Sequence, residues 1–172
     1  MWLSDRRTIL KLLAGAAPAA ALTACGFEPM YGDGASARHI YGRVDVDLIP
    51  TERGYALRER LVELLGPPDI ATHRLVVDLR VETDGVALTT ENVTTRYEVK
   101  GEANYRLVPL EGGPSALTDS VFAISRYSAP ETETSSAYAI RAAERDANLR
   151  VTRNLAEQMV RRLALNAPDW AT

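Results

Sequence analysis

The chain has 172 residues, of which 46% are hydrophobic and 25% are charged, and its formal net charge is -3. This length and apolar content predict one compact domain with a hydrophobic core, and the slight acidic excess argues against a nucleic-acid-binding protein. The single cysteine, Cys25, cannot form an intramolecular disulfide, and the sequence has no Cys/His cluster with metal-ligand spacing. We therefore expect no metal site, no redox chemistry and no cofactor.

The first 24 residues have the pattern of a bacterial export signal. A basic stretch, DRRTILK, is followed by the apolar run LLAGAAPAAALTA from Leu12 to Ala24. That run is shorter than the roughly 20 residues of a membrane-spanning helix, and Pro18 interrupts it. We therefore expect residues 1–24 to be a signal peptide that is cleaved from the mature protein.

The stretch SDRRTILK resembles the twin-arginine export motif. Arg6 and Arg7 would form the arginine pair, and Lys11 stands at the usual basic position. Ile9 departs from the pattern, because Phe is more common there. The alternative is that the two arginines form an ordinary positively charged n-region. Both export routes lead to the periplasm.

The tetrapeptide LTAC, which ends at Cys25, resembles the lipobox of bacterial lipoproteins. This resemblance implies cleavage before Cys25 and attachment of acyl chains to it. Each buried methylene contributes about 0.8 kcal/mol to membrane binding, so several chains anchor a protein firmly. Gly26 stands where an inner-membrane retention signal would have Asp, which favours the periplasmic face of the outer membrane. The alternative is that Cys25 is a small buried hydrophobic residue.

Residues 25–38 are expected to be the lipidated cysteine and a flexible tether, because GDGASAR is rich in Gly and Ser. Residues 39–172 should then form one periplasmic domain. In HIYGRVDVDLIP, the apolar residues Val44, Val46 and Leu48 alternate with charged ones, which predicts a half-buried strand.

A helix is predicted in the next stretch, TERGYALRERLVELLGPP. Its leucines fall on one helical face, and Gly66 with the two prolines after it should end the helix. The leucines on this face are Leu57, Leu61, Leu64 and Leu65.

Three further strands are predicted by alternation. HRLVVDLRVETDG should end in the turn pair Asp84-Gly85 and pair in parallel with the first strand, since a helix separates the two. A long strand from about Val93 to Leu107 has mostly apolar odd positions and polar even positions, which predicts one wet face. SALTDSVFAISRYS should be a fourth strand, apolar on both faces around Phe122 and Ile124.

The last predicted element is a helix from about Ala137 to Asn166. It carries an apolar stripe at three- and four-residue spacing, flanked by nine charged side chains. The stripe could contact a partner or a membrane surface, but its small alanines and mixed charges favour packing on the domain's own sheet. It consists of Ile140, Ala143, Ala147, Val151, Leu155, Met159 and Leu163.

These elements predict an α+β domain in two layers. Two helices should pack on one face of a four-stranded, mixed but mostly antiparallel sheet, in the order β-α-β-β-β-α. This order, the motif CGFEPMYG at the lipobox and the long final helix together resemble the LPS-assembly lipoprotein family LptE, in its shorter alphaproteobacterial form. The resemblance covers nearly the full chain by pattern, and CGFEPMYG is its one strict motif.

The resemblance implies a function without catalysis. LptE-like proteins occupy the lumen of the outer-membrane barrel LptD in a one-to-one complex, help the barrel assemble, and assist lipopolysaccharide delivery to the outer leaflet. It also implies that Cys25 is acylated. Phe27, Pro29 and Tyr31 match the family pattern and should pack the tether against the domain or the barrel wall. The alternative is a flexible linker that merely contains aromatic residues.

Four cations are candidates for contact with lipopolysaccharide. Strand alternation should place them on the sheet face away from the helices, where guanidinium groups can bind phosphate with two hydrogen bonds. The same pattern is typical of a solvated face on which Glu82, Glu98 and Glu102 pair with the cations. The candidates are Arg80, Arg96, Lys100 and Arg106.

Two other functional classes remain open. An enzyme would have only His39 and His73 as imidazole bases, and both border strands, are expected at the surface and lack a nucleophile motif. Asp45 and Asp47 share a strand face, but this spacing is common in solvated strands. The other class is a lipid-anchored periplasmic scaffold or chaperone unrelated to lipopolysaccharide.

Overall fold

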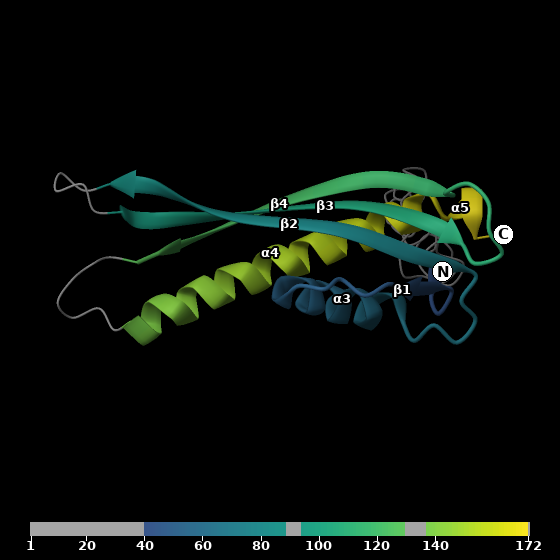
Figure 1. Cartoon of the computed structure of the whole chain (residues 1–172), viewed down its shortest axis with the longest axis horizontal. Coiled ribbons are helices and arrows are strands. Elements are labelled where there is room, and N and C mark those ends of the chain that lie inside the picture. The colour runs from purple at the N-terminus through teal and green to yellow at the C-terminus, as the bar shows by residue number, and fades with distance from the viewer. Residues whose placement is uncertain (1–39, 89–93, 130–136, 172) are drawn as a thin grey trace, which may run out of the picture. The chain divides into compact units, whose positions relative to one another are not determined.

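A computed structural model describes residues 40–88, 94–129 and 137–171, all within the compact unit Ser36–Thr172 (Figure 1). The predicted signal peptide and tether lie outside the described residues. The elements are β1 (Val44–Val46), α3 (Glu52–Leu65), β2 (His73–Leu88), β3 (Thr94–Pro109), β4 (Leu117–Ser128), α4 (Ala137–Leu165) and α5 (Ala167–Trp170). The predicted α+β class and element order are confirmed, with the short α5 added at the end.

The strands form one sheet in the order β1-β2-β3-β4. β1 pairs in parallel with β2, as predicted, and the other two pairings are antiparallel. The prediction of a turn at Asp84-Gly85 is wrong, because β2 stays paired with β3 as far as Leu88 opposite Thr94. Register shifts after Gly85 absorb the irregularity, so the ladder bends there without ending.

Helix α3 has well-defined ends. The hydroxyl of Thr51 accepts a hydrogen bond from the backbone N–H of Gly54 at 2.9 Å, and Gly66 ends the helix with a φ of 79°. Near its start, Arg53 donates to Asn148 of α4 at 2.7 Å. Since the two helices are in contact from this point onward, residues 137–147 of α4 extend beyond the start of α3 (Figure 1).

The hydrophobic core lies between the sheet and the two helices. The odd-numbered residues of β3 from Val99 to Leu107 are buried there, and the apolar stripe of α4 packs against them. Gly101 marks a close approach of β3 to α4, because a Cβ at this position would lie 2.4 Å from Cγ1 of Val151 and 3.0 Å from Cδ1 of Leu155. The prediction that α4 packs on the domain's own sheet is thus confirmed.

Two side chains lie elsewhere than predicted. Leu48 is 58% exposed while Ile49 is buried, because β1 ends at Val46 and the alternation ends with it. His73 is buried rather than at the surface, because α5 covers it: its ring meets that of Trp170 edge to face at 5.1 Å. Burial lowers the pKa of the His73 imidazole.

Candidate functional site

The even-numbered residues of β2, β3 and β4 form the sheet face that carries no helix, which we call the open face. The register places Arg80 opposite Glu102 and Lys100 opposite Ile124. Phe122 and Ile124 lie on this face with exposed fractions of 53% and 36%, so apolar side chains stand beside charged ones. All four predicted cations, Arg80, Arg96, Lys100 and Arg106, lie on the open face.

Lys100 belongs to a small ion-pair network. Its ammonium group donates to Asp84 at 2.9 Å and lies 3.7 Å from Glu98. The hydrogen bond to Asp84 raises the pKa of Lys100. Glu98 is nearly buried and also pairs with Arg126 of β4. Lys100 is therefore already bound by carboxylates, which is the arrangement expected of a solvated strand face.

The other three cations are more available. Arg80 is highly exposed and lies 3.9 Å from Asp78, a weak ion pair. Arg96 and Arg106 are exposed and form no ion pair within the described part of the chain. They lie ten residues apart on β3, or roughly 33 Å, so they cannot bind one phosphate together.

Arg126 is a cation of the open face that sequence reasoning missed. It shares strand parity with Phe122 and Ile124, so the alternation within β4 places it on this face. Its pairing with Glu98, however, depends on the register between β3 and β4. The alternation pattern was therefore a usable signal for its position but not for its partner.

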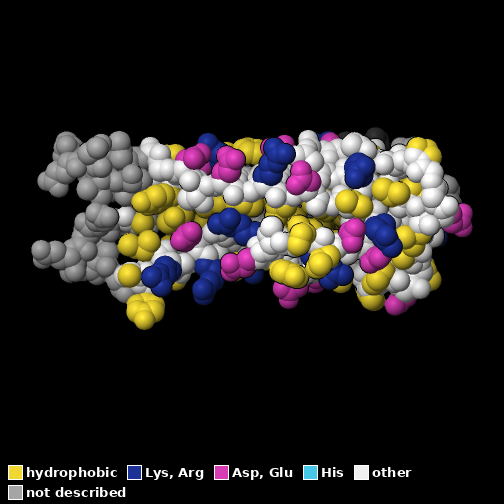
Figure 2. Space-filling view, in the orientation of Figure 1, with side chains coloured by type: hydrophobic (Ala, Val, Ile, Leu, Met, Phe, Trp, Pro, Cys, Tyr) yellow, Lys and Arg dark blue, Asp and Glu magenta, His cyan; other side chains and the backbone are white. Residues whose placement is uncertain are grey.

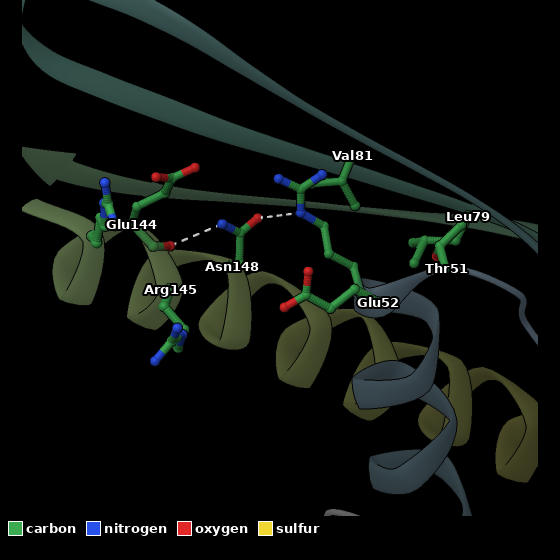
Figure 3. A pocket seen from close by; sticks show the side chains of 9 residues that line it. Thr51, Glu52, Leu79, Val81, Glu144, Arg145 and Asn148 are labelled. Atoms are coloured by element: carbon green, nitrogen blue, oxygen red, sulfur yellow. Dashed lines mark hydrogen bonds between the residues drawn. The ribbon is translucent and has the colours of Figure 1, made fainter.

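A groove of about 550 Å³ lies on the helix side of β2 (Figure 3). Its apolar side chains are Leu79 and Val81, and its polar wall comes from the start of α3 and the first half of α4. Asn148 accepts from Arg53 and donates to the backbone carbonyl of Glu144 at 2.9 Å. The wall residues are Thr51, Glu52, Arg53, Arg141, Glu144, Arg145 and Asn148.

The face of the molecule seen in Figure 2 carries a mixture of hydrophobic and charged side chains. Figure 2 shows hydrophobic side chains set among basic and acidic ones, with no large area of a single charge. Among the described residues, no group of three or more His, Cys, Asp or Glu side chains is placed to hold a metal ion. No helix in the described ranges is both long and apolar enough to span a bilayer.

The predicted anchoring and tether residues cannot be placed on this geometry. Cys25, Phe27, Pro29 and Tyr31 all lie outside the described residues. Their roles in lipidation and packing stay predictions. The described surface therefore offers two features for function: the charged open face and the groove beside β2.

Comparison with solved structures identifies a shared fold. A candidate lipoprotein from Caulobacter crescentus CB15 aligns with a TM-score of 0.59 and 22% identity, covering 76% of this chain and 93% of that chain. Rare lipoprotein B from Shewanella oneidensis gives 0.55 and 14%, with coverages of 76% and 98%. A minor lipoprotein from Acinetobacter baumannii gives 0.58 and 14%, with coverages of 74% and 93%. These identities support similarity of fold alone.

Sequence comparison assigns the family. None of the curated proteins matches the chain. The model of the LptE family, described as lipopolysaccharide-assembly, matches residues 41–163. This match runs from just before β1 almost to the end of α4, and so includes the whole sheet, all of α3 and nearly all of α4. The chain therefore belongs to the LptE family of lipopolysaccharide-assembly proteins.

Proposed function

We propose that the chain is an outer-membrane lipoprotein that occupies the lumen of an LptD-type barrel, helps it assemble and assists lipopolysaccharide delivery to the outer leaflet. The family match over residues 41–163 carries this proposal. The mixed charge of the face seen in Figure 2 supports it, because the interior of a wide outer-membrane barrel is polar. The proposed role is one of binding and assembly, with no reaction catalysed.

Anchoring would come from Cys25, acylated after removal of residues 1–24, with Phe27, Pro29 and Tyr31 packing the tether. Replacing Cys25 by Ala should abolish acyl labelling and release the chain from membranes, since the lipid is the proposed anchor. Labelling with a radioactive or clickable fatty acid and membrane fractionation measure both effects. Membrane-bound, labelled Cys25→Ala protein would contradict the assignment.

The open face is the proposed contact for lipopolysaccharide. Arg80, Arg96 and Arg106 offer guanidinium groups for phosphate, and Lys100 would contribute by exchanging Asp84 for a phosphate oxygen. Phe122 and Ile124 could contact acyl chains beside these charges.

The double variant Arg96→Gln/Arg106→Gln should weaken binding of fluorescent lipopolysaccharide at least tenfold, because a hydrogen bond to a charged group contributes about 1.5–3 kcal/mol. The matched control is Arg153→Gln/Arg161→Gln on the exposed side of α4, which removes the same charge elsewhere. Equal losses in both variants would show a general charge effect and reject the open face as the binding site.

Barrel assembly is tested by purification and depletion. The full chain should copurify with the barrel in a one-to-one complex, and its depletion should leave the barrel misassembled and lipopolysaccharide stranded inside the cell envelope. A chain that anchors normally but binds no barrel would instead support a lipid-anchored scaffold or chaperone unrelated to lipopolysaccharide.

A further inference from the structure

The two outer edges of the sheet differ in how their backbone groups are satisfied. Along β4, side chains of α4 reach the edge: Gln158 donates to the carbonyl of Phe122, and Arg150 donates to the carbonyl of Arg126, each at 3.0 Å. Side chains bound to an edge in this way hinder the addition of another strand. The β4 edge is therefore partly protected.

The edge of β2 is covered only at its beginning. β1 pairs with His73–Leu75 alone, and the last bond of this ladder runs from the N–H of Asp47 to the carbonyl of Leu75 at 3.0 Å. Because backbone groups point to alternate sides along a strand, the odd residues after Leu75 direct theirs to the same edge. These residues are Val77, Leu79, Val81 and Thr83, and their edge groups have no hydrogen-bond partner among the described residues.

The groove runs beside this unpaired edge. Leu79 and Val81 are half-buried, and their side chains line the groove. The wall contributes three arginines and two glutamates, which is a net positive charge. Arg141 and Arg145 are exposed and form no ion pair within the part of the chain that the structure describes. An incoming strand would thus meet apolar contacts, free backbone groups and unpaired cations together.

We propose that the edge from Val77 to Thr83 binds an extended, acidic segment of the barrel partner as an added strand. The identity of the partner rests on the function proposed above. The open edge spans seven residues, or roughly 23 Å, which is the length of an ordinary strand. Backbone hydrogen bonds would hold the segment, and its carboxylates would pair with Arg141 and Arg145.

A second copy of this chain fits the edge less well. Two-fold pairing of β2 with β2 would bring identical grooves together, so that the arginines of each copy would face those of the other. Since these arginines belong to α3 and α4 and not to the strands, the cost of this pairing is Coulomb repulsion between two positively charged grooves. Charge complementarity therefore favours an acidic segment of a different protein.

Residue-resolved amide hydrogen exchange tests the proposal in the full chain, alone and in the purified complex with its barrel. The four odd-position amides should exchange at least about 100-fold more slowly in the complex, because each gains a hydrogen bond. The amides of Asp78, Arg80 and Glu82, already directed at β3, should change little. This alternation is specific to strand addition, since general shielding would slow neighbouring amides alike.

A proline variant provides an independent readout. Thr83→Pro removes an edge N–H without removing a bond to β3, and should lower the affinity for the barrel about tenfold. Ser120→Pro removes an N–H on the β4 edge that is bonded only to the side chain of Asp119, at a residue not named in the proposed lipopolysaccharide contact, and should leave the affinity unchanged.

Several results would overturn the proposal. One is a complex in which the odd amides stay fast, which leaves the barrel-binding function intact. Another is protection already present in the isolated chain, which would assign the edge to the chain's own segment or, if it rises with concentration, to a second copy. A failure to form any complex would reject this proposal and the proposed function together.

Discussion

The two faces of the sheet are built from the same strands but are held by different interactions. Val99 and Leu107 of β3 are fully buried under α4, whereas their neighbours Lys100 and Arg106 lie on the open face among other charges. Period-two alternation thus gives one strand a buried face and a charged face. Substitutions on the covered face should change stability, and substitutions on the open face should change binding.

The largest difference between the two faces in their effect on the free energy of unfolding is expected for substitutions of Gly101 and its neighbour Glu102. Gly101→Ala places a methyl group 2.4 Å from Val151, so we expect a loss of about 1–3 kcal/mol in the free energy of unfolding. Glu102→Ala, one residue away on the open face, should change it by less than about 0.5 kcal/mol. Urea denaturation measures both, and equal effects would remove the distinction between the faces.

A smaller effect on stability, visible as a dependence on pH, is expected from His73, which α5 covers at the start of β2. Burial lowers the pKa of His73 in the folded chain, while the unfolded chain titrates near 6.5. The stability contributed by neutral His73 is therefore full above that pH and is lost as the pH falls below it. Unfolding free energies measured between about pH 8 and 5 should fall more steeply for the native chain than for His73→Gln. Parallel curves would contradict the burial of this imidazole.

The smallest effect on stability is expected from Arg106→Gln on the open face. Arg106 is exposed and forms no ion pair with the described residues, so the free energy of unfolding should change by less than about 0.5 kcal/mol. The same variant should weaken lipopolysaccharide binding if the open face is the contact. A stability loss comparable to that of Gly101→Ala would show that the open face also supports the fold.

Local patterns were sufficient to predict most of the fold. Alternation in β3 and the apolar stripe of α4 each indicate which face of one element is buried. The end of α3 at Gly66 likewise depends only on the local backbone conformation. The burial of His73 was missed because it depends on α5, a four-residue helix too short to leave a periodic signal.

The partners of the charged residues and the position of the groove could not be predicted from local patterns. The network of Lys100, Glu98 and Arg126 requires the cross-strand register, which alternation within one strand does not contain. The groove requires knowing where α3 begins relative to α4, a relation set by tertiary packing. The sequence was thus sufficient to predict on which face of the sheet each cation lies, but it did not predict the ion-pair partners of these cations.

The caps of α3 also determine how far the opening beside β2, which is the groove described above, extends along α4. Thr51 and Gly66 limit α3 to 14 residues, whereas α4 has 29, which corresponds to lengths of roughly 21 and 43 Å. Adding one helical turn after Thr51 would advance the start of α3 by about 5 Å without replacing a core side chain. A lineage of such proteins could therefore widen or narrow this opening through insertions and deletions at the start of α3, with a change of packing where buried Ile49 meets Gly54.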